Sequence, residues 1–373
     1  MKCTCSKDDL KNALQAVSRA VAEKPQTPVI AGIYLRAEGS TLEIQATDFS
    51  LEIIAKIPAN TEIDGEIVVI GKKLTEISGK LSGEIVTITD EEEEAMATLK
   101  SDAAKYSLLT LNAEDFPKIR PQQDFTNSFK IRVAALKNLI RCSTFACARD
   151  KQAAPMFLGC SVNLSGSDIT FVGTNTHRIA IAKDEILENE GDFQCIIPSK
   201  TLNDLSSMLD VKGNDKLVTV ECSTKRAAFS FDNIFVTSRL IDGQFPPIEK
   251  VIPESSDTFA TIEIAELREA ITRVDVIARD SEYSTVKLNF TQEGLEISAS
   301  ANQVGNFIEH VDADVEGPDI EISLNVAYIS DLMKIASEEK LKIGMTKPLA
   351  AIEIREIGND NFIYIMTPVR TRN

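Results

Sequence analysis

The sequence has few of the residues and patterns on which most enzymes depend. Its 373 residues include two histidines, His177 and His310, which is too few for a histidine-rich metal site and leaves few general bases. It contains no GxGxxG, GxxxxGK[ST], HExxH or GxSxG pattern, so the common dinucleotide, phosphate, zinc and nucleophile motifs are absent. We therefore expect a protein that is not an enzyme and needs no cofactor or metal. A hydrolase that uses a carboxylate pair among the 57 acidic residues is the remaining enzymatic alternative.

Cysteines and long apolar runs are also scarce. The seven cysteines form no CxxC pair and are odd in number, so we expect buried thiols in a reduced, cytoplasmic protein. No apolar run approaches the roughly 20 residues of a membrane helix. The N-terminus, MKCTCSKDDLKNAL, lacks the apolar segment of a secretory signal. The sequence therefore predicts no membrane association.

One helical pattern occurs three times, with copies about 128 residues apart. Its apolar positions follow the offsets 0, 3, 4, 7, 10 and 11, which mark one face of an α-helix. The copies are Leu10, Ala13, Leu14, Val17, Ala20, Val21; Leu136, Leu139, Ile140, Ser143, Ala146, Cys147; and Leu267, Ala270, Ile271, Val274, Ile277, Ala278. A repeat of this length indicates tandem domains, because solenoid repeats are much shorter.

A second, shorter helical pattern follows the first in each repeat. Its copies are Leu74, Ile77, Ser78, Leu81; Leu202, Leu205, Ser206, Leu209; and Ile329, Leu332, Met333, Ala336. β-Branched runs such as Leu42–Ala46 and Val286–Phe290 lie between the helices and are separated by turn residues. Few helices among sequential strands favour an α+β fold with antiparallel sheet. We predict three domains, at residues 1–125, 126–254 and 255–373.

Charge is distributed unevenly along the chain. The net charge is −17, which by itself argues against a nucleic-acid partner. The six predicted helix windows (7–22, 72–80, 132–149, 199–209, 265–279 and 326–336) nevertheless hold 15 Lys or Arg against 8 Asp or Glu. Helix propensity would favour Glu as much as Lys, and Glu is scarce in these windows. If the helices form one layer, that layer predicts an anionic partner.

Seven short segments follow one another along the threefold repeat. They are Thr27–Ile30, Ala46–Asp48, Asp115–Pro117, Thr174–Ala180, Asp242–Pro246, Leu324–Tyr328 and Tyr364–Arg370. In this order they resemble segments of the bacterial beta sliding clamp family, the beta subunit of DNA polymerase III, and the resemblance covers the whole chain.

The resemblance implies three copies of the DNA-clamp domain and a head-to-tail homodimer that closes a six-domain ring around duplex DNA. In such a ring the helices line the hole and the sheets form the outer wall. The resemblance further implies that the protein catalyses nothing and acts as a processivity factor in DNA replication by tethering the replicative polymerase. An ATP-dependent clamp loader would open it. A diverged clamp-like scaffold that does not encircle DNA is the non-enzymatic alternative.

The resemblance also implies three sets of site residues. Client proteins would insert a short peptide, close to Gln-Leu-Ser/Asp-Leu-Phe, between the second and third domains. The matching positions are Phe157, Thr174, Thr176, His177, Arg178, Ile179, Pro246, Lys250, Val251, Asn325, Tyr328, Leu349, Ile365, Met366, Thr367, Pro368, Val369 and Arg370. Thr176 replaces a glycine that is common in the family, and Thr367 replaces a common methionine. Expected DNA contacts are Lys24, Arg141, Arg149, Lys151 and Lys200, and the expected ring seam is Tyr106 and Leu108 against Ile277 and Ala278.

Overall fold

The computed structural model describes residues 1–91, 95–119, 125–150, 152–189, 191–210, 216–248 and 250–370. They form two compact units. The first consists of Met1–Val133, Leu187–Gly191 and Asp204–Leu240, and the second of Ala134–Ile186, Asp192–Asn203 and Ile241–Asn373. The division runs through the second repeat, because strands of that repeat extend sheets in both units. The boundaries near 125 and 254 therefore remain a prediction: they divide the chain into sequence repeats, and these repeats do not coincide with the two compact units.

The first unit contains a 13-stranded sheet in which every neighbouring pair is antiparallel. Its order is β1 (Lys2–Ser6), β6 (Ile85–Glu91), β7 (Met96–Ser101), β8 (Ala104–Leu111), β5 (Gly65–Ile70), β2 (Gly32–Glu38), β3 (Thr41–Thr47), β4 (Leu51–Ile63), β17 (Ile234–Arg239), β16 (Arg226–Phe231), β15 (Leu217–Cys222), β9 (Asn127–Arg132) and β13 (Glu188–Asn189). The 13-residue strand β4 pairs with β17 through its first half and with β1 through its second. The strands of the first repeat therefore close on themselves, while β4 also accepts a strand from the second repeat.

The second unit contains a nine-stranded and a four-stranded antiparallel sheet. The larger has the order β14 (Phe193–Pro198), β10 (Gly159–Ser165), β11 (Asp168–Thr174), β12 (Arg178–Glu185), β26 (Phe362–Met366), β25 (Ile352–Glu356), β24 (Lys340–Met345), β18 (Thr258–Glu263) and β22 (Asp314–Glu316). The smaller has the order β21 (Gly305–Val311), β20 (Gly294–Ala301), β19 (Thr285–Thr291) and β23 (Ile320–Asn325). The β12–β26 pair repeats the β4–β17 arrangement. The described sheets are antiparallel, so the expected antiparallel α+β fold is confirmed.

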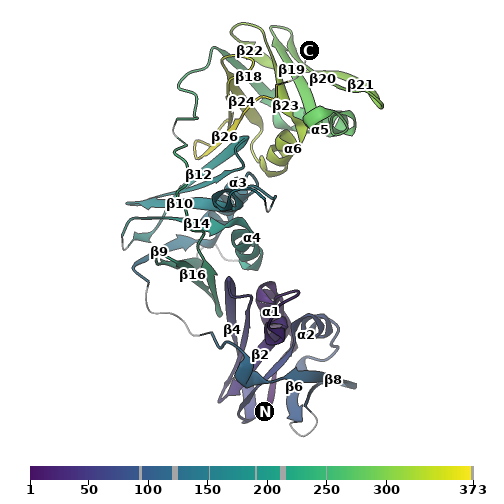
Figure 1. Ribbon diagram of the computed structural model, residues 1–373, viewed down its shortest axis with the longest axis vertical. Helices are drawn as coiled ribbons and strands as arrows, with labels where there is room; N and C mark the ends of the chain where they lie inside the picture. Colours follow the sequence, from purple (N-terminus) through teal and green to yellow (C-terminus); the bar gives the residue numbers. More distant parts are fainter. Residues whose placement is uncertain are drawn as a thin grey trace. The chain divides into compact units, whose positions relative to one another are not determined.

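Each repeat contributes two α-helices to the described residues. They are α1 (Lys7–Val17), α2 (Gly71–Ser78), α3 (Val133–Thr144), α4 (Ser199–Met208), α5 (Ile264–Ala278) and α6 (Val326–Ile335). In Figure 1, α1 packs beside α2, and α5 beside α6. The inward face of α1 consists of Leu10, Ala13, Leu14 and Val17, all buried as the pattern predicts. Ser6 caps this helix by accepting a hydrogen bond from the Asp9 backbone N–H at 3.3 Å.

The first helix of a repeat reaches its full predicted length only in the third repeat. α1 ends at Val17 and continues as a 3₁₀ turn, Ser18–Ala20, and α3 ends at Thr144. Helices over 7–22 and 132–149 were therefore too long. Ala20 and Ala146 remain fully buried even so, because a tighter turn still directs these positions inward.

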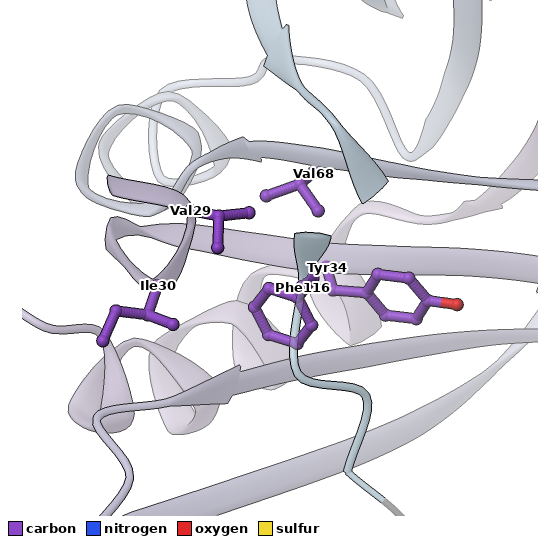
Figure 2. Packing of buried hydrophobic residues seen from close by; sticks show 5 residues of the cluster. All are labelled: Val29, Ile30, Tyr34, Val68 and Phe116. Carbon is purple, nitrogen blue, oxygen red and sulfur yellow. The ribbon is translucent and has the colours of Figure 1, made fainter. Parts of the chain in front are cut away.

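The segment that closes the first repeat packs across strands β2 and β5 (Figure 2). Phe116 stacks on Tyr34 with ring centroids 5.3 Å apart and an interplanar angle of 15°. The Tyr34 hydroxyl donates to Glu66 at 2.6 Å, and the Lys118 ammonium group donates to the other oxygen of that carboxylate at 2.6 Å. Phe116 thus anchors the end of the repeat, and the polar tip of Tyr34 is satisfied at the edge of the core.

Candidate functional site

The hairpin between β11 and β12 is built by a Thr-Asn-Thr-His-Arg turn. The Asn175 carboxamide oxygen accepts the backbone N–H groups of His177 and Arg178, each at 3.1 Å. The Thr174 hydroxyl donates to the Arg178 carbonyl at 2.7 Å. Asn and Thr side chains commonly close turns in this way. The turn therefore follows from its own sequence and places His177 and Arg178 at the start of β12.

Thr176 lies at the tip of this turn with a φ of +76°. A β-branched residue rarely adopts this left-handed region, because its Cβ crowds the backbone. The Thr176 backbone N–H donates to the Thr174 hydroxyl at 3.2 Å, which helps to hold the conformation. A glycine at this position would adopt it without strain.

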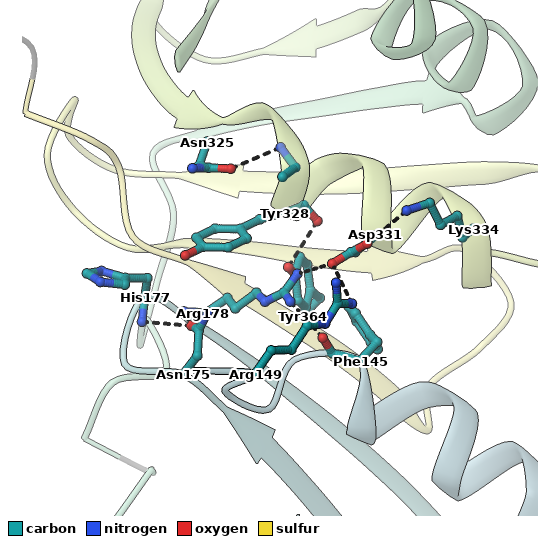
Figure 3. A network of polar contacts seen from close by, with 11 residues as sticks. Phe145, Arg149, Asn175, His177, Arg178, Asn325, Tyr328, Asp331, Lys334 and Tyr364 are labelled. Atoms are coloured by element: carbon teal, nitrogen blue, oxygen red, sulfur yellow. Dashed lines mark hydrogen bonds and ion pairs between the residues drawn. The ribbon is translucent and has the colours of Figure 1, made fainter. Parts of the chain in front are cut away.

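Arg178 carries the charge at the centre of the site (Figure 3). Its side chain is only 3% exposed, and its Nη1 atom donates to Asp331 Oδ2 at 3.0 Å. Its Nη2 atom donates to the Phe145 carbonyl at 2.6 Å. The guanidinium carbon lies 4.5 Å from the Tyr328 ring centroid, within range of a cation–π interaction. Among the described residues, Arg178 Nε is a buried donor without a partner.

Asp331 of α6 collects three cations around one carboxylate. Besides Arg178, it accepts Arg149 Nη2 at 3.3 Å and Lys334 Nζ at 3.0 Å. Burial raises the pKa of Asp331, but its bonds to Lys334 and Arg178 more than offset that effect, so the pKa lies below its ordinary value. The carboxylate is therefore ionised at neutral pH and fixes Arg178 against α6.

An apolar cluster lies beside this charged network. Its buried members are Val172, Ile179, Ile181, Ile363 and Ile365, and Phe245, Ile248, Ile252 and Ala351 pack against them while remaining partly exposed. The strand ladder pairs Ile179 with Ile365 across β12 and β26. Val251 and Leu349 are close in sequence to Ile252 and Ala351 of this cluster, and they are 40% and 60% exposed. Partly exposed aliphatic groups beside a few fixed polar groups suit a peptide with apolar side chains.

The corresponding hairpin of the first repeat, between β3 and β4, has the same strand register and a similar φ at its tip, but polar side chains occupy the equivalent positions. Its ladder pairs Thr47 with Glu52 as that of the second pairs Thr174 with Ile179, and Phe49 at its tip has a φ of +68°. By this register, the positions equivalent to Val172, Ile179 and Ile365 are Gln45, Glu52 and Thr237.

These polar groups in the first repeat already have partners. Gln45 donates to and accepts from the Ile119 backbone at 3.2 and 2.9 Å, and Glu52 forms an ion pair with Arg226 at 2.9 Å. Of the two equivalent hairpins, that of the second repeat is therefore the one suited to an apolar ligand.

Comparison with known proteins agrees with this architecture. The N-terminal, central and C-terminal domain models of the DNA polymerase III beta subunit match residues 1–120, 130–247 and 249–370. The beta sliding clamp of Bacillus subtilis is 28% identical over 382 residues, covering 100% of both chains. The crystal structure of the Bacillus subtilis sliding clamp superposes with a TM-score of 0.93 at 27% identity, over 100% of both chains.

The chain belongs to the DNA polymerase III beta subunit family. Another member with a solved structure, the sliding clamp of Pseudomonas aeruginosa bound to griselimycin, superposes with a TM-score of 0.92 at 26% identity over 100% of both chains. Membership in this family confirms the resemblance seen in the sequence, along with the tandem clamp fold.

Several expected peptide contacts of this family lie close together in the second unit. The rings of His177 and Tyr328 stack with centroids 6.5 Å apart. Thr367 donates to the His177 carbonyl through both its backbone N–H and its hydroxyl, each at 3.0 Å. Asn325 caps α6 by accepting the Ala327 N–H at 2.9 Å. The two ends of the predicted site, near 177 and 367, are therefore joined directly.

The remaining predicted positions differ in how accessible they are. Met366 is fully buried, so its side chain is part of the core. The neighbouring Tyr364 is also fully buried and donates to the Tyr328 carbonyl at 3.1 Å, and burial raises its pKa above the ordinary value. Phe157, Pro368 and Val369 are half-buried, whereas Pro246, Lys250 and Arg370 are exposed.

The residues expected to contact DNA differ in their exposure and in their bonding partners. Lys24 and Lys200 are exposed. Arg141 donates to the Ile335 carbonyl and, at 2.8 Å, to Asn138. Arg149 is bound to Asp331, although its side chain is 74% exposed. Lys151 lies outside the described residues. The two arginines therefore have structural partners in addition to any role on DNA.

One residue of the expected ring seam is wrong. Ala278 is fully buried, because its place in the helical pattern directs it into the core of the third repeat. Ile277, Tyr106 and Leu108 are half-buried and remain candidates. The more exposed apolar neighbours are Val276 at 52% and Leu109 at 63%.

Asp331 was missed by the sequence analysis, although the sequence carries a signal for it. Two residues after the first apolar position of the second helix, the three repeats have Glu76, Asp204 and Asp331. An acid at the same place in every repeat is unusual on otherwise basic helices. The side chain of Arg19 donates to Asp204 at 3.2 Å, which shows the same acid used in another repeat.

The residues that the structure describes include neither a membrane-spanning helix nor a cluster of metal ligands. No helix there is long and apolar enough to span a membrane. No cluster of three or more His, Cys, Asp or Glu residues in the same ranges could hold a metal ion.

Proposed function

We propose that this protein is a sliding clamp that encircles duplex DNA and tethers the replicative polymerase. The observation that carries the proposal is the ordered match of all three family domains along the chain. The excess of Lys and Arg in the helices supports it, because duplex DNA carries about one negative charge per 1.7 Å. A mildly basic lining attracts DNA without holding it at one place. The clamp itself performs no chemistry and acts in the cytoplasm.

Processivity then follows from topology. A closed ring cannot leave the duplex sideways, so a polymerase bound to it stays near the primer end after each release. The polymerase meets that end at a high effective concentration, although no contact to DNA has to be strong. In this proposal an ATP-dependent loader opens the ring; because this sequence has no phosphate-binding loop, any ATP used for opening binds to another protein.

Client proteins bind, in this proposal, at the apolar cluster of Val172, Ile179, Ile181, Ile363 and Ile365. Leucine and phenylalanine side chains of a peptide close to Gln-Leu-Asp-Leu-Phe would cover Val251 and Leu349 on its rim. His177, Asn325 and Thr367 would orient the peptide backbone through polar contacts. The polar partners of Gln45 and Glu52 argue against a second such site in the first repeat.

The strand pairing between successive repeats suggests how two chains would join. The fourth strand of one repeat pairs with the last strand of the next, as β4 does with β17 and β12 with β26. In the third repeat the corresponding strand is β21, the edge of its four-stranded sheet. In the first repeat the corresponding last strand is β8. We therefore expect β21 of one copy to pair with β8 of another, which gives a head-to-tail ring of two chains.

The deciding experiment measures retention on DNA. The protein, loaded by its loader, should remain on closed circular DNA and leave after the circle is cut once. Rapid loss from intact circles would contradict encirclement. Equal retention on cut and intact circles would also contradict it, because that result indicates tight binding rather than a topological link.

A fluorescence-polarisation titration tests the peptide site separately. A labelled Gln-Leu-Asp-Leu-Phe peptide should bind with micromolar affinity, and Val251→Asp combined with Leu349→Asp should abolish binding. Both side chains are well exposed, so this variant should fold normally. Exposed Lys225→Asp, in the turn between β15 and β16, is the charge-matched control. Unchanged binding in the double variant would show that the peptide site lies elsewhere.

A further inference from the structure

The apolar cluster of the proposed peptide site is almost fully covered in this structure. Its five members expose between 1% and 8% of their surface. Part of the cover comes from the segment that closes the second repeat, residues 245–248, whose Phe245 and Ile248 side chains pack directly against the cluster. A leucine or phenylalanine of a client peptide therefore reaches the cluster only if part of this cover moves aside.

The first repeat closes with a related segment that is held in place by polar and aromatic contacts. Residues 116–119 read Phe-Pro-Lys-Ile, and residues 245–248 read Phe-Pro-Pro-Ile. The Gln45 side chain accepts the Ile119 backbone N–H at 2.9 Å and donates to the Ile119 carbonyl at 3.2 Å. The phenylalanine of this segment stacks on Tyr34 (Figure 2). Both apolar side chains of the segment are buried as a result.

Neither of these two anchors has an equivalent in the second repeat. Val172 stands at the position of Gln45, and its hydrocarbon side chain cannot bond a backbone group. Ser161 stands at the position of Tyr34, since each faces the fourth residue of the paired strand, β14 or β5. Because a serine offers no ring, Phe245 has no stacking partner there.

The closing segment of the second repeat is therefore held mainly by its apolar contacts. Pro246 and Pro247 have no N–H to donate. Within the described ranges, the hydrogen bond of residues 245–248 is a local one, from the Val251 N–H to the Ile248 carbonyl at 2.9 Å. Gly243, two residues before the segment, has a φ of +139°, where a glycine turns freely. A short, stiff segment beside a flexible residue can move as a unit.

We infer that residues 245–248 form a displaceable cover, which occupies the apolar cluster in the free protein and leaves it when a client peptide binds. The inference rests on the proposed peptide site and states how that site is regulated. The phenylalanine and isoleucine of the cover resemble the leucine and phenylalanine of the client, so both compete for one surface. Peptide affinity is then reduced by the fraction of molecules in which the cover is closed.

Shortening the cover tests this competition in the full-length protein. The dissociation constant of the labelled Gln-Leu-Asp-Leu-Phe peptide is measured by fluorescence polarisation for wild type and Ile248→Ser. We expect the substitution to lower the dissociation constant at least about threefold, because the open fraction rises by the same factor. Ile119→Ser is the matched control, since it makes the same change at the equivalent position of the first repeat. It should leave the dissociation constant unchanged.

A second variant loosens the cover without removing an apolar contact. Pro247 is exposed, and Pro247→Gly gives the segment more freedom in the open state. It should also lower the dissociation constant. Stopped-flow mixing adds a kinetic readout: both variants should speed association and leave dissociation unchanged, because the cover has left the cluster before the complex forms.

The possible failures are distinguishable. Weaker or unchanged binding by both Ile248→Ser and Pro247→Gly would overturn the cover, because Ile248 would then be a fixed wall of the site. The proposed site would still stand if Val251→Asp with Leu349→Asp abolished binding. Binding that survives this double variant would overturn the site and the cover together, as would failure of wild type and both cover variants to bind the peptide. Circular dichroism of each variant separates these results from misfolding.

Discussion

Arg178 Nη1 lies 3.0 Å from Asp331 Oδ2, and both side chains are almost completely enclosed. The pair joins the turn before β12 to the middle of α6, two segments 153 residues apart in sequence. Because Tyr328 also lies on α6 and faces the Arg178 guanidinium, the pair fixes one polar wall of the proposed peptide site. A buried charge is tolerated only when it is paired, so each member depends on the other.

Replacing Asp331 with Asn should destabilise the protein by about 3–5 kcal/mol, because Arg178 would remain buried without an ionic partner. Urea unfolding followed by circular dichroism measures the change. Lys334→Met is the control: this lysine also binds Asp331 but is 71% exposed, so its loss should cost less than about 1 kcal/mol. Equal effects of the two substitutions would show that burial of the Arg178 pair does not matter.

The contribution of Asp331 should depend on pH in a defined direction. Its pKa is lower in the folded protein than in the unfolded chain, where an aspartate has a pKa of about 3.9. The stabilisation is therefore complete above about pH 5 and is lost as the pH falls below 4 towards the folded-state value. The stability difference between wild type and Asp331→Asn should be constant from pH 6 to 8 and shrink at pH 3.5. A difference that grows on acidification would contradict this assignment.

Thr176→Gly should stabilise the protein by up to about 1 kcal/mol, since glycine removes the strain of a left-handed threonine. The gain is limited by the greater freedom of glycine in the unfolded chain. Thr176→Ala serves as the control, because alanine keeps a Cβ and hence the strain. Thermal unfolding of the three proteins measures the order, and a glycine variant less stable than the alanine variant would refute the strain argument.

Charge at Ile277 should produce monomers if this residue lies in the seam. Ile277→Asp is compared with wild type by light scattering at matched concentration. Asp275→Asn on the same helix changes charge by a similar amount and should keep the dimer. A dimeric Ile277→Asp protein would remove α5 from the proposed interface.

Neutralising Lys24 and Lys200 should weaken DNA binding in a salt-dependent manner. Each lost phosphate contact reduces the slope of log K against log salt by about 0.9. Arg149 is left unchanged in this test, because it also binds Asp331. Exposed Lys225→Ala, in the turn between β15 and β16, is the control. An unchanged slope would show that the two lysines do not contact phosphate.

The sequence alone determined the features that depend on local periodicity. Apolar offsets placed Leu10, Leu139 and Ala270 inward, and all three are buried. Alternating strands separated by turns predicted antiparallel sheet, since each strand and its neighbour are close in the chain. The Thr-Asn-Thr-His-Arg segment built its turn from its own side chains. These predictions succeeded because the interactions that fix them lie within a few residues.

Which distant residues meet depended on how the whole chain folds. The sequence gives no local reason for Asp331 to face Arg178, or for Gln45 and Glu52 to make one hairpin polar while Val172 and Ile179 make its equivalent apolar. Our prediction from the sequence also placed the buried Ala278 in the seam and made α1 and α3 too long. Pairing across repeats depends on how sheets join at β4–β17 and β12–β26. Contacts of that kind form only once the chain has folded and its distant segments are brought together.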